Sequence, residues 1–190
     1  MKVFASHRFT CKKVLCCEIS PTQLAKSILR ALLKLLEPQP VLLAHLWGQF
    51  RAIVLQGYLP RVIKEMLGLV VATATHCEYV RVVHMHSLTL QGMDQKALEA
   101  VIRGEYGAKE ISNVARAALQ FAALATATRA AYDSSTEGQG TWQELRQQTA
   151  QALEDTGLEE EEKFEVVATV ALFEQICTVA NLLGLDPSQP

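Results

Sequence analysis

Apolar side chains recur at helical spacing along almost the whole chain from Ser20 onward, and this periodicity constrains the fold more than any other feature. Leu24, Ile28, Leu32 and Leu35 are one example. An amphipathic helix produces such spacing because one turn takes about 3.6 residues. No segment shows sustained alternation of apolar and polar residues between turns, which is the pattern of a half-buried strand. The sequence therefore predicts an all-α protein, folded as a multi-helix bundle.

Caps, prolines and glycines divide the periodic pattern into separate helices. The first begins at Ser20, which is followed by a proline and then, three residues on, by Gln23 in a capping box. The predicted helices cover residues 20–36, 41–56, 61–75, 77–91, 94–103, 109–132 and 159–184. The pattern leaves open whether the third and fourth are continuous. Residues 133–140 have the composition of a loop, after which Thr141 and Glu144 form a second capping box.

The overall composition indicates one compact domain and argues against several classes of partner. A chain of 190 residues can bury a core without disulfide staples. Its net charge of −2, from 18 basic and 20 acidic side chains, does not indicate nucleic-acid or membrane-surface binding. No apolar run approaches the roughly 18–20 residues that a membrane span requires. The acidic run 159–162 is expected to form the first turn of the last helix, where negative charge complements the helix dipole.

The cysteines and the N-terminal residues bear on location and domain boundaries. The chain has five cysteines, odd in number and irregularly spaced: Cys11, Cys16, Cys17, Cys77 and Cys177. This does not fit a secreted disulfide framework, so we expect a cytoplasmic protein. The apolar run within residues 1–20 is too short for a signal peptide. We expect a loosely ordered N-terminal extension over residues 1–20 and a single helical domain over residues 21–190.

A short internal repeat raises the question of duplication. The tetrapeptide Val-Val-Ala-Thr occurs at residues 70–73 and again at 166–169. The same register aligns Glu65 with Glu161, and Val80 with Ile176. A duplicated helical unit would explain the match, and chance repetition of valine and alanine is the alternative.

One set of residues carries a chemical signature: an acid, a thiol and an imidazole at Glu65, Cys77 and His84. If residues 77–84 form one helix, positions 77, 80 and 84 share a face of it. Cys77 and His84 would then lie about 10 Å apart along the helix axis, too far for a direct hydrogen bond. The position between them, one turn from His84, is occupied by Val80.

These residues resemble the carboxymuconolactone decarboxylase / alkylhydroperoxidase D (AhpD-like) superfamily. Its peroxidase branch carries a glutamate, then C-x-x-C, then a histidine four residues after the second cysteine. Lys64-Glu65 matches the preceding helix motif, and CEYVRVVH (77–84) matches the rest without a gap. The flanking segments GYLPRVIKE (57–65) and HSLTLQGMD (86–94) are also similar to the family. The resemblance spans about residues 40–185 and implies an AhpD-like helical fold and an antioxidant, hydroperoxide-reducing activity.

The resemblance also implies a role for each residue of the set. Glu65 would hold and polarise His84, and His84 would lower the pKa of a thiol, because the thiolate is the nucleophile. Cys77 matches the first family cysteine, which donates a proton and closes the disulfide. The second family cysteine, which attacks the peroxide, is replaced by Val80. The two-cysteine cycle of the family therefore cannot run in this chain.

Three interpretations of Cys77 remain open. It could act alone as a redox thiol, or it could be an inert core cysteine. It could also pair with Cys177, because the internal repeat places Cys177 one position past the counterpart of Val80. Surviving redox chemistry predicts a partly exposed Cys77 in a pocket with Glu65 and His84. Two broader alternatives are a catalytically inactive oligomeric or small-ligand-binding protein, and a carboxymuconolactone decarboxylase-type enzyme that uses His84.

The sequence indicates no cofactor and no metal. It contains no H-E-x-x-H motif, no second ligand pair at helical spacing and no glycine-rich phosphate loop. The resemblance implies a homo-oligomer, whether dimer, trimer or hexamer, and the helices predicted over 20–36 and 41–56 are the candidate contact surfaces. A small-molecule substrate and a thiol reductant are the other expected partners, with no nucleic acid and no membrane.

Overall fold

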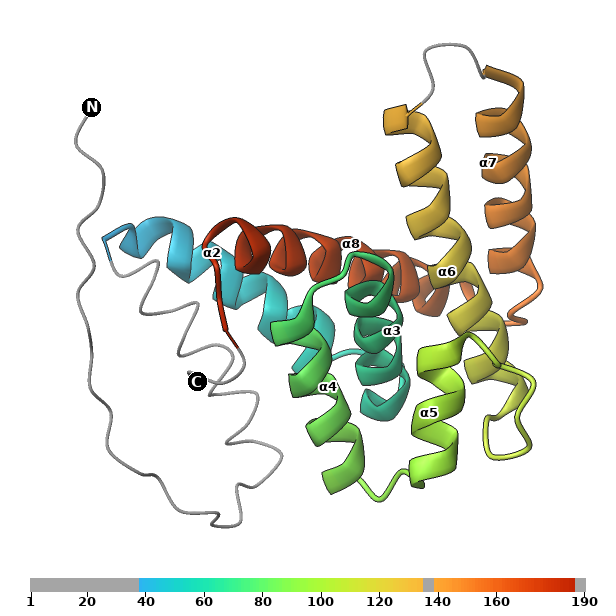
Figure 1. Cartoon of the computed structure of the whole chain (residues 1–190), viewed down its shortest axis with the longest axis horizontal. Coiled ribbons are helices and arrows are strands. Elements are labelled where there is room, and N and C mark those ends of the chain that lie inside the picture. Colours follow the sequence, from blue (N-terminus) through green and yellow to red (C-terminus); the bar gives the residue numbers. More distant parts are fainter. Residues whose placement is uncertain (1–37, 135–138, 187–190) are drawn as a thin grey trace.

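The computed structural model describes residues 38–134 and 139–186 (Figure 1). These residues form seven α-helices and one short π-helix, with no β-strand among them. The elements are α2 (Pro40–Phe50), the π-helix η1 (Arg51–Leu55), α3 (Arg61–Ala74), α4 (Glu78–Leu90), α5 (Gln95–Arg103), α6 (Asn113–Ser134), α7 (Gln139–Glu154) and α8 (Glu160–Leu182). The predicted all-α fold is confirmed. The helix predicted over 20–36 and the extension predicted over 1–20 lie outside the described residues.

Most predicted helices agree with the structure to within a few residues. The loop predicted over 133–140 is too long, because α6 and α7 extend into it from both sides. Thr141 consequently lies inside α7 instead of capping it. The two helices pack against each other, and the hydroxyls of Thr128 and Thr149 are hydrogen-bonded between them at 2.9 Å. Tertiary contacts of this kind extend helices through residues of turn-like composition.

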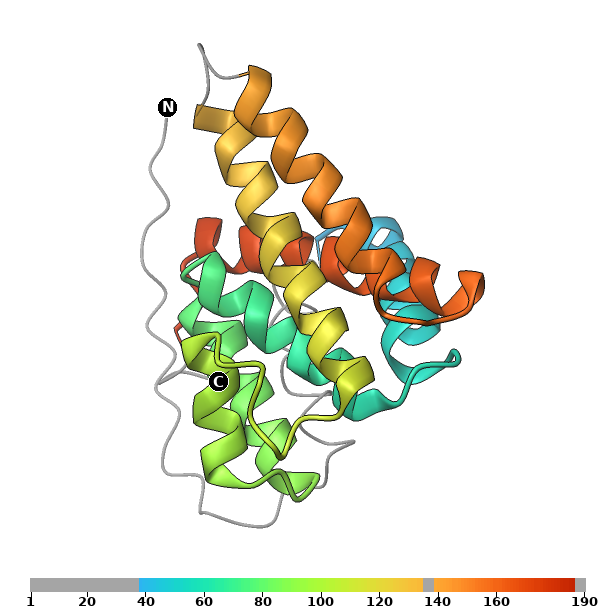
Figure 2. The ribbon, with the colours of Figure 1, turned by 90° about the vertical axis from the view of Figure 1, so that its right-hand side faces the viewer.

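Helix α3 lies at the centre of the fold, where α4, α6 and α8 pack against it. Every residue from 63 to 72 is buried. A helix buried on all sides is expected to be apolar all round, and α3 is so except at Lys64 and Glu65. Helices α6 and α7 form a hairpin whose free end projects beyond the other described helices (Figure 1, Figure 2). The site described below therefore lies in the α3–α4–α8 part of the molecule.

A tight turn at Thr75, His76 and Cys77 separates α3 from α4. His76 has a φ of 53°, a left-handed conformation that non-glycine residues adopt infrequently. The N–H of Cys77 donates to the carbonyl of Ala72 at 2.8 Å, and the N–H of His76 donates to the carbonyl of Thr73 at 3.3 Å. These two bonds make up the Schellman motif that ends many helices. The turn makes Cys77 the N-cap residue of α4.

A buried ion pair between α3 and α8 fixes the segment that precedes α3. Lys64, only 1% exposed, pairs with Glu165 of α8 and donates a hydrogen bond to the carbonyl of Gln56 at 2.6 Å. Glu165 also accepts the N–H groups of the two residues after Gly57, at 2.8 and 2.9 Å. Gly57 has a φ of 99°, and a side chain there would overlap the Glu165 carboxylate. One carboxylate thus joins α8 to α3 and to the loop before it.

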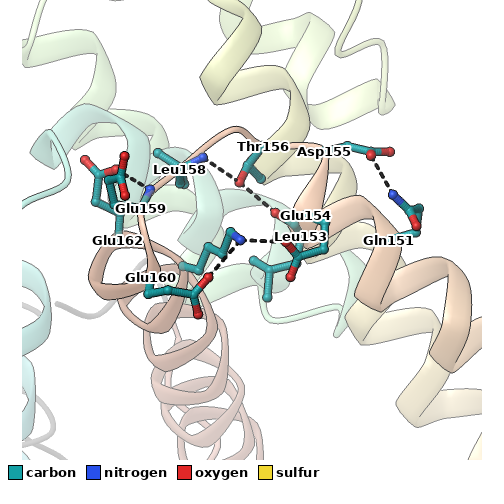
Figure 3. A network of polar contacts seen from close by, with 10 residues as sticks. Gln151, Leu153, Glu154, Asp155, Thr156, Leu158, Glu159, Glu160 and Glu162 are labelled. Atoms are coloured by element: carbon teal, nitrogen blue, oxygen red, sulfur yellow. Dashed lines mark hydrogen bonds and ion pairs between the residues drawn. The ribbon is translucent and has the colours of Figure 1, made fainter.

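The start of α8 is held by polar contacts around the α7–α8 loop (Figure 3). The N–H of the N-cap residue Glu159 donates to Oε2 of Glu162 at 3.0 Å. Lys163 bridges Glu154 of α7 at 2.6 Å and Glu160 at 3.0 Å. The acidic run therefore forms the N-cap and first turn of α8, which confirms the expectation from its charge.

By length and composition, α8 is also the one described helix that could cross a membrane. Half of its most apolar window is nevertheless buried inside the domain. The buried side chains include Val166, Val170, Phe173 and Ile176, which join the core cluster. The apolar character of α8 is thus accounted for by its packing against α3.

The two copies of the internal repeat lie in α3 and α8, which pack against each other. When the two copies are aligned in sequence, the residues of the α3–α4 turn match residues inside α8, where the helix is not interrupted. A repeated pair of helices is therefore not seen over this range, and the duplication stays a prediction.

The ion pair of Lys64 can be tested by Glu165→Gln, which removes the charge and keeps the size of the side chain. We expect the free energy of unfolding to fall by about 3–5 kcal/mol, because Lys64 would stay buried without a counter-charge. Urea denaturation measures this. The matched control is Glu154→Gln in the exposed pair with Lys163, for which little change is expected. Equal effects of the two substitutions would contradict the role given to Glu165.

Candidate functional site

Glu65 and His84 form a buried hydrogen-bonded pair between α3 and α4. Nδ1 of His84 and Oε2 of Glu65 are 2.7 Å apart, and the side chains are 3% and 5% exposed respectively. Arg61, one turn earlier on α3, donates from Nε to Oε1 of Glu65 at 3.0 Å. Each carboxylate oxygen therefore has a donor. The contact expected between Glu65 and His84 is present.

The surroundings of Glu65 favour its ionised form. Burial alone would raise the pKa of this carboxyl, but the hydrogen bond and charge of His84, together with Arg61, lower it below its ordinary value. An ionised carboxylate can only accept hydrogen bonds, so Nδ1 of His84 carries the proton in this contact. In the neutral ring, Nε2 is then the acceptor.

The second ring nitrogen of His84, Nε2, is buried and has no hydrogen-bond partner. It faces Gly68 of α3 closely, since a Cβ at Gly68 would lie 2.4 Å from it. Phe173 of α8 packs edge to face on the imidazole, with ring centroids 4.5 Å apart. The ring is therefore enclosed by α3, α4 and α8, with one nitrogen left free. Buried polar atoms without partners are rare in folded proteins and often mark functional sites.

Val80 is 1% exposed and lies one turn before His84 on α4. Residues four apart are neighbours on the surface of a helix. An apolar side chain thus occupies the position where the resemblance places the attacking thiol, and it offers no hydrogen bond to the imidazole. The lost thiol and the unpartnered Nε2 of His84 are consistent with each other.

Cys77 does not join the Glu65–His84 pair. It precedes α4 as its N-cap, so this helix starts one position after its predicted start, and the carbonyl of Cys77 accepts the N–H of Arg81 at 2.9 Å. Its thiol instead lies near that of Cys177 on α8. Both cysteines are free and 0% exposed, so the partial exposure expected for Cys77 is wrong.

The proximity of the two thiols shifts their pKa values in opposite directions. The hydrogen bond from Cys177 lowers the pKa of Cys77 to about 7 against the effect of burial, and the N–H of Val80 in the first turn of α4 lowers it as well. The same hydrogen bond, burial and the nearby carboxylate of Glu174 raise the pKa of Cys177. The proton therefore stays on Cys177, and Cys77 is the thiol that ionises first.

Three residues of the site were not predicted from the sequence: Arg61, Gly68 and Phe173. Two of them leave a local signal. Arg61 stands four residues before Glu65, the spacing of a helical ion pair. Gly68 interrupts a helical pattern, which indicates a close approach of another group. Phe173 leaves no such signal, because its partner His84 lies far away along the chain.

The arrangement offers two kinds of chemistry. The Glu65–His84 pair can take up and return a proton at Nε2 of the imidazole. The Cys77–Cys177 pair can ionise and be oxidised. Residues 38–134 and 139–186 contain no group of three or more histidine, cysteine, aspartate and glutamate side chains that could hold a metal ion.

The close fit between Gly68 and His84 can be tested by Gly68→Ala. We expect a loss of about 1–3 kcal/mol in the free energy of unfolding, because the added methyl group would displace the imidazole. Gly48→Ala in α2 is the matched control, since a Cβ there meets nothing within 4 Å. It should stabilise the protein by about 0.5–1 kcal/mol, as alanine does in a helix. A stabilising effect at both positions would contradict the contact.

The lowered pKa of Glu65 predicts a pH dependence of stability. The ionised Glu65 carboxylate contributes to the free energy of unfolding. This contribution is fully present above the unfolded-state pKa of about 4.3 and is lost as the pH falls through the lower folded-state pKa. Glu65→Gln should therefore be less stable than the wild type at neutral pH, and the difference should shrink below about pH 4. Denaturation of both proteins across this range gives the difference. A constant difference down to the most acidic pH would be inconsistent with an ionised Glu65.

The segment that carries Glu65, Cys77 and His84 is similar to a known protein family. Residues 42–124 match the model of the carboxymuconolactone decarboxylase family. This stretch contains α3 and α4, and with them Glu65, Cys77 and His84. A search of curated protein sequences found no significant match.

The fold is similar to several solved structures. An uncharacterized peroxidase-related protein from Ralstonia eutropha, an alkylhydroperoxidase AhpD core, is 21% identical with a TM-score of 0.62, over 93% of this chain and 92% of that one. A peroxidase-related protein from Silicibacter sp., also uncharacterized, is 17% identical with a TM-score of 0.57, over 76% of this chain and 69% of that one. A cysteine-to-alanine variant of the debrominase Bmp8, in complex with 2,3,4-tribromopyrrole, is 16% identical with a TM-score of 0.60, over 84% of this chain and 82% of that one.

At these identities the structural likeness establishes the fold, and the family match covers α3 and α4 but not α8. Residues 42–124 are thus similar to the carboxymuconolactone decarboxylase family, and the described helices have an AhpD-like fold.

Proposed function

We propose that this protein is a thiol-dependent oxidoreductase related to the alkyl hydroperoxide reductases of its superfamily, and that Cys77 is its reacting thiol. The observation that carries the proposal is the environment of Cys77. It lies at the N-terminus of α4, where the helix dipole favours an anion, and the nearby thiol of Cys177 lowers its pKa. Of the two cysteines in the described residues, it is the one whose pKa is lowered.

An ionised Cys77 can attack a hydroperoxide, because the thiolate is the nucleophilic form of cysteine. The pKa of Cys77 is lowered to about 7, so its thiolate is more accessible at neutral pH than that of an ordinary cysteine. The sulfur attacks the terminal oxygen, so that a sulfur–oxygen bond forms and the oxygen–oxygen bond breaks. The alcohol leaves as an alkoxide and takes up a proton. Cys77 becomes a sulfenic acid, which an external thiol reductant restores.

Glu65 and His84 would support the transfer of protons in this reaction. Glu65 fixes the tautomer of the imidazole, so that Nε2 is the nitrogen that can exchange a proton. This nitrogen belongs to a residue about two turns along α4 from Cys77, so a proton passing between them needs a water molecule or the substrate as a bridge.

The burial of Cys77 limits what can react with it. Because the residue is 0% exposed, the substrate must be small and the first turn of α4 must open transiently. Helix ends open at a lower free-energy cost than helix centres, and this end directly follows the left-handed turn at His76. The proposal therefore predicts reaction with hydrogen peroxide or short alkyl hydroperoxides rather than with bulky ones.

Two observations favour other candidate functions. The complete burial of Cys77, with Val80 at the attacking position, favours a catalytically inactive family member that binds a small ligand or acts through its assembly. The unpartnered Nε2 of His84 favours a decarboxylase-type enzyme in which the histidine alone handles the proton.

We also propose that the protein is a cytoplasmic homo-oligomer. Helix α2 exposes large apolar side chains, with Val41 70% and Leu42 52% exposed. Adjacent apolar side chains on a surface are typical of a region that a partner covers. The choice among dimer, trimer and hexamer can be made by light scattering.

Peroxide is expected to consume the Cys77 thiol of the wild-type protein. Trypsin releases Cys77 in peptide 65–81 and the other four cysteines in different peptides, so alkylation followed by mass spectrometry follows each site separately. Cys77→Ser should abolish oxidation of this peptide. Val80→Cys should consume peroxide at least about tenfold faster, because it places a thiol one turn from His84.

The same comparison identifies failure of the proposal. If Cys77 keeps its free thiol under peroxide concentrations that oxidise Val80→Cys, the wild-type site does not react and the catalytically inactive alternative stands. Circular dichroism of each variant checks that the helical fold is retained.

A further inference from the structure

Helix α8 brings a second thiol to the site from far along the chain. Phe173 of α8 packs on His84, and one turn later Cys177 lies near Cys77. Cys77 precedes His84 in the sequence, whereas their neighbour Cys177 follows Phe173. Helix α8 therefore runs antiparallel to α4 along this stretch. The motif lacks its second cysteine at Val80, but the fold supplies a cysteine from the opposite side.

The backbone around the two thiols is held in place by further contacts. Nδ2 of Asn181, one turn after Cys177, donates to the carbonyl of Thr75 at 3.2 Å. The N–H of Cys77 is bonded to the carbonyl of Ala72 at 2.8 Å. These bonds hold the α3–α4 turn against the C-terminal part of α8 and keep the sulfurs together.

We propose that Cys77 and Cys177 form the redox-active thiol pair of this protein, with Cys177 as the resolving cysteine in place of the one absent at position 80. The inference rests on the proposed function, because it requires Cys77 to react with a hydroperoxide. Its geometric basis is that both thiols are free and fully buried, and that the bond from Asn181 to Thr75 holds the segments that carry them side by side. A sulfenic acid on Cys77 would therefore form within reach of the Cys177 sulfur, in a place that excludes most other thiols.

The reaction balances with a hydroperoxide as oxidant and an external dithiol as reductant. The Cys77 thiolate takes the terminal oxygen of the peroxide, and the alkoxide that leaves takes the proton of Cys177. The Cys177 thiolate then attacks the sulfur of the Cys77 sulfenic acid, which forms the disulfide and releases hydroxide, neutralised by a solvent proton. The reductant is oxidised to its disulfide as the two thiols are restored.

The surroundings of the two sulfurs indicate which one attacks the peroxide and which one then closes the disulfide. Cys77 lies at a helix N-terminus, whereas Cys177 lies within α8, one turn after the carboxylate of Glu174. Negative charge is therefore favoured on Cys77 and opposed on Cys177. Cys77 attacks the peroxide in this chain, although it aligns with the family cysteine that closes the disulfide.

The identity of the oxidised product tests the inference. After peroxide treatment and alkylation of free thiols, trypsin should release peptide 65–81 disulfide-bonded to peptide 164–190. The cross-linked species should be absent from Cys177→Ala, in which a sulfenic-acid probe should instead label Cys77. Replacing Cys11, Cys16 and Cys17 together by serine is the matched control, and it should leave the cross-link unchanged.

The outcomes separate this inference from the proposed function. Oxidation of Cys77 without a cross-link to Cys177, or with a cross-link to one of the N-terminal cysteines, would overturn the pairing and leave Cys77 as a reacting thiol. No oxidation of Cys77 in either the wild type or Cys177→Ala would overturn the proposed function itself. The cross-link in the wild type is measured without any substitution, so the test does not depend on the folding of a variant.

Discussion

Two adjacent charged residues, Lys64 and Glu65, are buried in the central helix, and the packing of the other helices depends on them. A buried charge without a partner costs several kcal/mol, so each of the two requires a partner from another element. Lys64 takes Glu165 of α8 and the carbonyl of Gln56, and Glu65 takes His84 of α4. Helices α4 and α8 are therefore both fixed to α3 in a defined register.

That register determines which side chains of α8 meet α4. From Glu165, Phe173 and Cys177 lie about two and three turns further along the helix. The ion pair at the start of α8 thus sets the position at which one side chain contacts His84 and the other contacts Cys77. The candidate site consists of a proton-exchanging pair and a thiol pair, and both depend on the same helix packing.

The sequence predicted the features that follow from local periodicity and from spacing within one segment. The described helices and the all-α fold are of this kind, whereas the Glu65–His84 contact was predicted only from the resemblance to the AhpD-like family. The loop before Thr141 was predicted too long, since packing between α6 and α7 is not encoded by turn composition. The left-handed turn at His76 that ends α3 has no glycine or proline to mark it, so the sequence left open whether α3 and α4 are continuous.

Contacts between distant segments were the least predictable. Nothing local to Lys64 indicates that its partner is Glu165, and nothing local to His84 indicates Phe173. Cys177 is an exception, because the internal repeat aligned it next to the counterpart of Val80 and so named it as a partner of Cys77. The structure brings these thiols together, although the same register does not reproduce a pair of helices around Cys177.

The central claim is that Cys77 and Cys177 form one reversible redox couple, and a redox titration tests it most directly. The intact wild-type protein is equilibrated over a range of thiol–disulfide buffer potentials, free thiols are alkylated, and peptides 65–81 and 164–190 are quantified. The account predicts that both peptides lose their label together, with one midpoint and the slope of a two-electron couple. Retention of the label on both peptides at every potential, or loss at different midpoints, would contradict it.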